Sequence, residues 1–128
     1  MQILSLKTRK ISRTDKQTRW YSSSGEGTLP RPTALDPASN HQIGDIYVHR
    51  INEQIEYVVP RMQIWVWKLC EEAEEPSWVE VRNLMHEHHP SVDMSHLFLR
   101  FTESWKPSWV VIATAKRRGI PQLRRHVD

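Results

Sequence analysis

The residues with the clearest capacity for chemistry are four histidines in the last third of the chain. His86, His88 and His89 lie within four residues of one another, and His96 follows shortly after. Imidazoles and carboxylates such as Glu87 are common ligands of zinc, nickel and iron. However, the His-x-His-His spacing matches no metal motif, and on a helix His88 would point away from the other two. We therefore expect a solvent-exposed histidine-rich loop, and a metal-dependent enzyme is the least favoured hypothesis.

No other cluster predicts catalysis. Ser91, Asp93 and Ser95 lie near His96, but a catalytic triad is defined by geometry and not by adjacency in sequence. The four glycines of the chain could not form a phosphate-binding loop as well as the turns. We therefore favour a non-enzymatic binding protein without a cofactor.

The C-terminal tail carries the strongest binding signal. A stretch of ten residues in this tail contains five cations, and Gly119 and Pro121 prevent a long regular helix. Clustered cations of this kind contact phosphates. Our first hypothesis is therefore a nucleic-acid or ribonucleoprotein-associated module. The predicted phosphate contacts are Lys116, Arg117, Arg118, Arg124 and Arg125.

The charge of the chain is unevenly distributed. Residues 1–42 hold seven Lys/Arg and three Asp/Glu, residues 43–103 hold five and eleven, and residues 104–128 hold six and one. Two basic ends therefore flank an acidic body, which includes a solvated Glu-rich link over residues 71–76. The second hypothesis follows: a protein-interaction or structural assembly subunit, whose basic ends dock on the acidic body of a neighbour. The oligomeric state is left open.

Three of the six tryptophans could form a binding surface. Trp65, Trp67 and Trp78 cannot all face the same way as Ile64 and Val66, because side chains alternate along a strand. Either a second layer covers them or they form an exposed aromatic patch. Exposed aromatic patches mark sites for protein partners or nucleobases.

The elements that would position these residues are strands. Apolar alternation marks residues 43–51, 54–60, 62–69, 77–81 and 97–102, and residues 109–115 form an apolar, β-branched run. Asn52-Glu53 suits a hairpin between the first two runs, and Pro60-Arg61 separates the second from the third. We predict a mainly β domain over residues 41–115, with α+β as the alternative. Its form would be a small antiparallel sheet or a barrel-like meander.

The two ends are expected to be flexible and basic. Residues 1–40 are predicted to be a disordered arm, and residues 116–128 a tail. The N-terminus is basic, rich in Ser and poor in acid, so it resembles a mitochondrial transit peptide, and Arg19-Trp20-Tyr21-Ser22 resembles a matrix-processing pattern. The single Cys70 favours a reducing compartment, and no apolar run approaches the length of a membrane span. We expect an intracellular protein, mitochondrial if the transit peptide is real and cytoplasmic or nuclear otherwise.

One further resemblance concerns the central strands. Gly44-Asp45-Ile46-Tyr47-Val48, followed by Trp65-Val66-Trp67 and Ser77-Trp78-Val79, resembles the short β-repeats of phage tail and fibre proteins. The resemblance implies a β-meander and carries over no functional residue. It adds a viral-type subunit, beside a mitochondrial one, to the forms that the second hypothesis can take.

Overall fold

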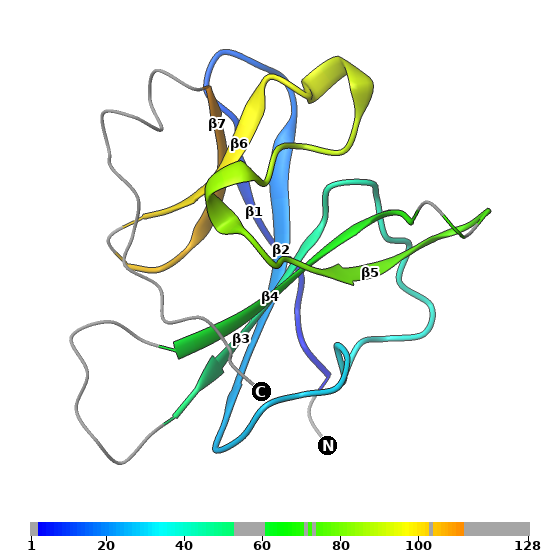
Figure 1. Ribbon diagram of the computed structural model, residues 1–128, viewed down its shortest axis with the longest axis vertical. Coiled ribbons are helices and arrows are strands. Elements are labelled where there is room, and N and C mark those ends of the chain that lie inside the picture. Colours follow the sequence, from blue (N-terminus) through cyan, green and yellow to red (C-terminus); the bar gives the residue numbers. More distant parts are fainter. Residues whose placement is uncertain (1–2, 53–60, 71, 73, 103, 112–128) are drawn as a thin grey trace.

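The protein is built almost entirely of strands. The computed structural model describes residues 3–52, 61–70, 72, 74–102 and 104–111. Of these residues, 45% are in strands and 6% in helices, which confirms the prediction of a mainly β protein (Figure 1). The elements are β1 (Lys7–Lys10), β2 (Gln17–Gly25), β3 (Ile46–Ile51), β4 (Arg61–Leu69), β5 (Pro76–Glu80), the short 3-10 helices η1 (Leu84–His86) and η2 (Val92–Met94), β6 (Leu97–Phe101) and β7 (Pro107–Val111).

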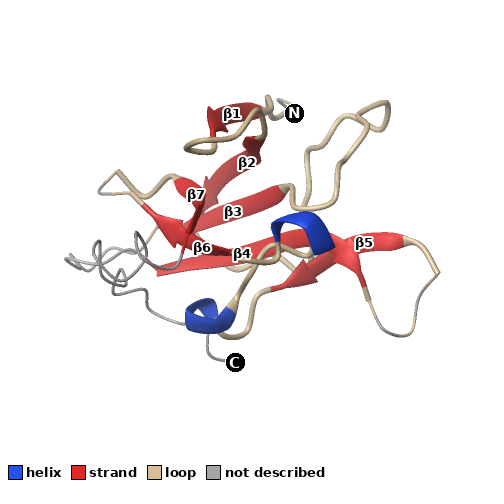
Figure 2. Ribbon diagram, turned by 90° about the horizontal axis from the view of Figure 1, so that it is seen from above, coloured by secondary structure: helices blue, strands red, loops and turns tan. Residues whose placement is uncertain are grey.

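The strands form one open five-stranded sheet and one hairpin. The sheet has the order β1-β2-β3-β4-β5, and β6 pairs with β7 (Figure 2). Every pair is antiparallel except β2 and β3, which run parallel from Trp20↔Ile46 to Gly25↔Ile51. The expectation of a purely antiparallel sheet is therefore wrong at this pair, and the described sheet does not close into a barrel. A parallel pair needs a long crossover, which residues 26–45 supply.

The expectation of a disordered arm over residues 1–40 is wrong for β1 and β2. Along β2, Thr18 and Trp20 are buried on one face of the sheet and Tyr21 on the other. β2 is an interior strand with neighbours on both sides, so serines and threonines occupy positions that usually hold branched apolar residues. The polar composition of the segment concealed the alternation.

The later strands agree closely with the predicted ones. β4, β5 and β6 match the predicted strands to within a residue at either end, whereas β7 starts two residues earlier, at Pro107. Residues 112–115 and the predicted strand at residues 54–60 lie outside the described part of the chain. The two edges of β3 pair with β2 and β4, so the hairpin partner of β3 is β4 and not the predicted strand at residues 54–60.

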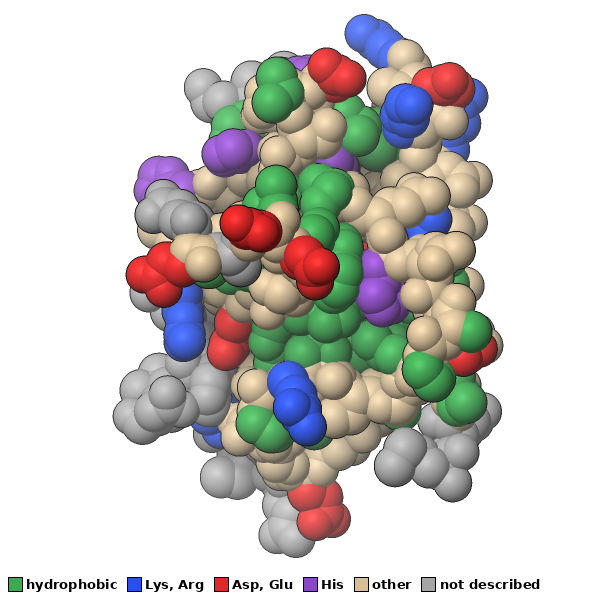
Figure 3. Space-filling view, turned by 90° about the vertical axis from the view of Figure 1, so that its right-hand side faces the viewer, with side chains coloured by type: hydrophobic (Ala, Val, Ile, Leu, Met, Phe, Trp, Pro, Cys, Tyr) green, Lys and Arg blue, Asp and Glu red, His purple; other side chains and the backbone are tan. Residues whose placement is uncertain are grey.

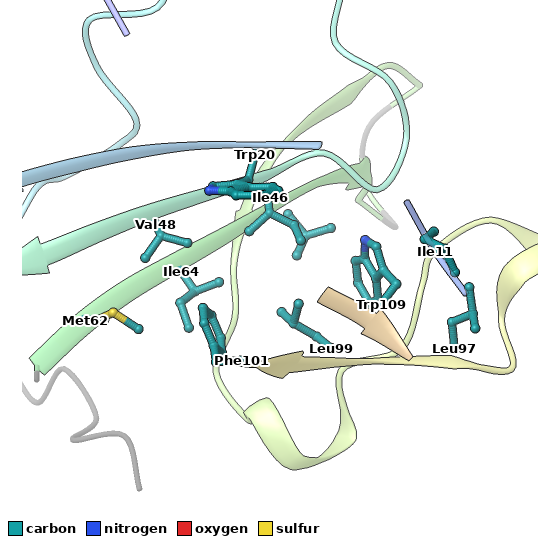
Figure 4. Close-up of a cluster of buried hydrophobic side chains, with 11 residues drawn as sticks. Ile11, Trp20, Ile46, Val48, Met62, Ile64, Leu97, Leu99, Phe101 and Trp109 are labelled. Atoms are coloured by element: carbon teal, nitrogen blue, oxygen red, sulfur yellow. The ribbon is translucent and has the colours of Figure 1, made fainter. Parts of the chain in front are cut away.

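The main core lies between the sheet and the β6–β7 hairpin. Trp109, at 1% exposed, is its largest fully buried side chain, and Leu99 is fully buried between the two layers (Figure 4). The Trp109 indole N–H donates to the carbonyl of Gly44 at 3.1 Å, so the ring is both buried and satisfied. We call this side of the sheet the hairpin face. Its buried apolar residues are Ile11, Trp20, Ile46, Val48, Met62, Ile64, Val66, Leu97, Leu99, Phe101 and Trp109.

The opposite side of the sheet is covered by the crossover, and we call it the loop face. Tyr47 and Trp65 are buried here beneath Leu29 and Leu35. Polar groups hold the crossover in place. Gln63 exchanges two hydrogen bonds with the backbone of Leu29, at 2.7 and 3.0 Å. The Tyr47 hydroxyl lies 3.0 Å from the carbonyl oxygen of Thr33.

A histidine also anchors the start of the crossover. His49 Nδ1 lies 2.8 Å from the Ser23 hydroxyl, and its Nε2 lies 2.8 Å from the carbonyl oxygen of Gly27. Because a carbonyl only accepts, Nε2 carries the proton and Nδ1 accepts from Ser23. His49 is 3% exposed, so this chain of hydrogen bonds satisfies a buried polar side chain.

Candidate functional site

The histidine cluster is divided between surface and interior. His86, His88 and His96 are exposed, as predicted. His89 is only 3% exposed and packs against Trp109, with the two ring centroids 4.8 Å apart. The prediction of an exposed loop is therefore wrong for His89. Its main-chain N–H pairs with Leu97 in the strand-like segment beside β6, which turns the side chain inward. Within the described residues, no three His, Cys, Asp or Glu side chains are placed to hold a metal ion.

His89 is held in its neutral form. Burial lowers its pKa to about 4, and the neighbouring His88 and His96 add to the effect. Its Nδ1 accepts a hydrogen bond from the backbone N–H of Ser91 at 3.1 Å. The ring lies directly against Gly44, whose φ of +97° is a left-handed conformation. Only glycine combines that backbone conformation with room for the imidazole.

The three predicted patch tryptophans fall on the loop face, but only two reach the surface. Trp65 is 3% exposed and packs edge-on against Tyr47. Trp67 and Trp78 are partly exposed and form a cross-strand pair, with their ring centroids 5.3 Å apart. Leu69, at 59% exposed, pairs with Pro76 at the end of the same two strands. We define the aromatic surface as His41, Trp67, Leu69, Pro76 and Trp78.

His41 completes the aromatic surface. Its ring lies 4.8 Å from Trp67, 5.1 Å from Trp78 and 5.8 Å from Tyr21. Burial lowers the pKa of His41, an effect that Asp45 partly offsets. The imidazole is therefore a neutral part of an aromatic wall at pH 7. The signal that could have found it was weak, because His41 lies within a proline-rich crossover and matches no periodic pattern.

Acidic side chains adjoin the aromatic surface. The β4–β5 turn exposes Glu72, Glu74 and Glu75, and Glu80 extends from the same face of β5 as Trp78. Figure 3 shows a continuous hydrophobic area with a histidine beside it, acidic side chains along its upper margin and a basic side chain at its lower margin. From residue 69 to residue 80 the sequence holds five glutamates and no cation. This part of the loop face therefore has a negative potential.

A groove of opposite character lies on the hairpin face. The β6–β7 hairpin leaves uncovered the ends of β2, β3 and β4, where a cavity of about 770 Å³ opens. Its cations are Lys7, Arg50 and Lys106, and no Asp or Glu is among the described residues that line it. We call it the basic groove. The remaining lining residues are Leu4, Thr8, Trp20, Ser22, Ser23, Ser24, Val48, Met62, Ser104, Trp105 and Pro107.

The β6–β7 turn presents an aromatic ring to the basic groove. Trp105 has a φ of +62°, which a bulky residue rarely adopts. The turn is fixed by the Trp105 N–H donating to the Thr102 carbonyl at 2.9 Å and the Lys106 N–H donating to Thr102 Oγ1 at 3.2 Å. Strain of this kind persists where the surrounding structure enforces it, and it is concentrated at binding and active sites.

Further cations lie beside the basic groove. β1 is exposed along its whole length and carries Lys7, Arg9 and Lys10. Lys7 Nζ donates to the Ser22 hydroxyl at 2.6 Å, which fixes the ammonium at the edge of the groove. These residues came from the segment predicted to be a basic arm. The missed signal was that its cations lie along a strand and not in a random coil.

The predicted phosphate-contacting residues of the tail cannot be compared with this groove. Lys116, Arg117, Arg118, Arg124 and Arg125 lie outside the described residues, so their role stays a prediction. The transit-peptide hypothesis also stays a prediction. In the folded chain Trp20 and Tyr21, at its processing pattern, are 5% and 3% exposed.

Comparison with protein-family models, with curated proteins and with solved structures found no match. None of the helices in the described residues is long and apolar enough to cross a membrane. The molecule has two candidate binding surfaces: a basic groove with an aromatic ring on the hairpin face, and an aromatic surface with an acidic margin on the loop face.

Proposed function

We propose that this protein is a non-enzymatic module that binds single-stranded nucleic acid in the basic groove. The observation that carries the proposal is the combination of Lys7, Arg50 and Lys106 around one cavity, with no carboxylate among its described lining residues. Cations in such a groove neutralise backbone phosphates and release counterions, which makes binding favourable and sensitive to salt.

The apolar lining of the groove supports a single strand over a duplex. Proteins that bind single strands combine a positive groove with aromatic rings on which bases stack, and Trp105 is placed for that role. The Ser22 and Ser24 hydroxyls of β2 add hydrogen-bond donors for phosphate or sugar oxygens. The bases of a regular duplex are stacked on one another, so a duplex could contact the groove cations through its phosphates but could not stack on Trp105.

The test compares two double variants of equal charge. Arg50→Gln/Lys106→Gln removes two groove cations, whereas Arg31→Gln/Arg82→Gln removes two exposed cations that do not line the groove. We expect the groove variant to bind a fluorescent single-stranded oligonucleotide roughly 10-fold more weakly, with a salt slope smaller by about 1.4 for two lost phosphate contacts. The matched control should stay close to the wild type.

A second variant tests the aromatic contact. Trp105→Gly relieves the positive φ and removes the ring, and base stacking on an aromatic side chain is worth about 1–3 kcal/mol. Single-strand affinity should therefore fall while affinity for a duplex stays unchanged. Absence of any affinity at low salt, or equal losses in the groove and control double variants, would refute the proposal.

A further inference from the structure

The aromatic surface is partly open, although most of the loop face is covered. The crossover buries Tyr47 and Trp65, but it leaves Trp67 and Trp78 half-buried and Leu69 59% exposed. Contiguous apolar groups that stay partly exposed in this way mark interaction sites. The surface lies on the opposite side of the sheet from the basic groove, so it does not rest on the proposed nucleic-acid function.

The charges around the aromatic surface select a cationic occupant. Glu72, Glu74 and Glu75 are exposed at the adjoining turn, and Glu80 lies on the same face of β5 as Trp78, 3.9 Å from Arg82. Lysine and arginine side chains are attracted both by carboxylates and by the faces of tryptophan rings. An anionic partner would be repelled. The complementary ligand is thus a segment rich in Lys and Arg.

The chain itself supplies such a segment. Residues 116–125 hold five cations and no acid. They begin five residues after Val111, the last described residue, and a stretch from Val111 to residue 125 can span up to about 50 Å. A domain of about 100 residues has a radius of gyration near 13 Å, so the segment can reach the loop face. Tethering also gives it an effective concentration on the order of millimolar.

We propose that the aromatic surface is the docking site of this chain's own C-terminal basic segment, residues 116–125. Lys and Arg side chains of the segment lie over the Trp67 and Trp78 rings and pair with the glutamates of the β4–β5 turn. The contact is intramolecular and weakens as salt screens it.

The test follows the indole N–H signals of the full chain by nuclear magnetic resonance. Neutralising the tail (Lys116, Arg117, Arg118, Arg124 and Arg125, all to Gln) should shift the signals of Trp67 and Trp78 and leave those of the buried Trp20 and Trp109 unchanged. Assignment comes from Trp67→Phe and Trp78→Phe. A control variant neutralises five cations elsewhere, Arg9, Lys10, Arg13, Lys16 and Arg31, and should leave all of these signals in place.

The reciprocal variant removes the acidic margin. Glu72→Gln/Glu74→Gln/Glu75→Gln should reproduce the signal shifts of the variant with the neutralised tail. A synthetic peptide of residues 112–128, added to the variant with the neutralised tail, should restore the wild-type signal positions. Unmoved Trp67 and Trp78 signals, or equal shifts in the control, overturn the proposal. Wild-type positions that depend on protein concentration overturn it too, because they place the segment on a second copy.

Discussion

The two faces of the central sheet are covered by different means. On the hairpin face, β6 and β7 bring a second layer of apolar side chains, with Leu97, Leu99 and Trp109 at 1% exposed or less. On the loop face, an irregular segment is held by hydrogen bonds from Gln63, Tyr47 and His49. One cover depends on buried apolar area and the other on a few directional contacts.

This difference predicts two kinds of stability. Removing apolar contacts from the hairpin face should destabilise the whole fold, since that face holds the main core. Removing a hydrogen bond from the loop face should open the crossover locally, because segments with few buried apolar contacts open well below the global free energy of unfolding. The following substitutions test the comparison, beginning with the largest effect.

Leu99→Ala should lower the free energy of unfolding more than any other substitution proposed here. The side chain is fully buried between β6 and the sheet, and truncating a buried leucine to alanine costs about 2–5 kcal/mol. Chemical denaturation followed by tryptophan fluorescence measures the loss. The partly exposed Met94→Ala, at the margin of the same cluster, is the control and should cost less. Equal losses would mean that the hairpin does not provide the main core.

Acidification should weaken the hairpin face through His89. Its pKa is about 4 in the folded protein and 6.5 in the unfolded chain, so the unfolded chain binds more protons between these values. The contribution of neutral His89 to the free energy of unfolding is complete above pH 6.5. It declines by up to about 3 kcal/mol as the pH falls toward 4. Asp45 lines the same pocket as His89. Burial raises the pKa of Asp45, so its effect on the free energy of unfolding has the opposite pH dependence.

Denaturation at pH 7 and pH 4.5 measures this effect. His89→Asn keeps an acceptor for the Ser91 N–H and should flatten the pH dependence of the free energy of unfolding, whereas His86→Asn, at an exposed histidine that does not perturb the pKa of His89, should leave it unchanged. Identical pH dependence of the wild type and His89→Asn would show that another group is responsible.

Gln63→Met should loosen the loop face alone. It removes both hydrogen bonds to Leu29, each worth about 0.5–1.5 kcal/mol. We expect amide hydrogen exchange to speed up roughly 5- to 150-fold in the crossover, while protection in β6 and β7 is retained. Gln17→Met at an exposed position is the control. Loss of protection throughout the protein would show that the two covers are not independent.

Lys68→Gln should have the smallest effect. Lys68 Nζ lies 3.1 Å from Glu87 Oε2 and ties β4 to the segment after η1. A partly exposed pair of this kind contributes about 0–1 kcal/mol. Thermal unfolding should therefore change little, because the hairpin face does not depend on polar contacts. A loss as large as that of Leu99→Ala would contradict that conclusion.

The sequence predicted strands well wherever apolar alternation was strong. β4 and β6 follow directly from the alternation of Met62, Ile64 and Val66 and of Leu97, Leu99 and Phe101. β2 was missed because Thr18 and Ser22 occupy its interior-facing positions beside a single Trp20, so its pattern resembles that of a polar linker. Propensity fails where tertiary contacts decide.

The candidate sites were harder to predict than the strands. The basic groove joins Lys7, Arg50 and Lys106, which are far apart in the sequence and meet only through the fold. The aromatic surface was half predicted, because strand alternation put some of the three tryptophans on the second face but could not show that His41 would join Trp67 and Trp78 there. The inward turn of His89 depends on its backbone pairing with Leu97, a contact that composition does not encode.

The bond between the backbone N–H of Trp109 and the Thr18 hydroxyl, at 3.2 Å, joins residues 91 positions apart. Its consequence lies in biosynthesis. A ribosome adds about 5–20 residues per second, so β2 waits roughly 5–20 s for the hairpin that will cover it. During that interval Trp20, Ile46 and Val66 have no partner layer. The nascent chain therefore exposes an aromatic and aliphatic surface to the cell, and chaperones that bind such surfaces should engage it before its final residues emerge.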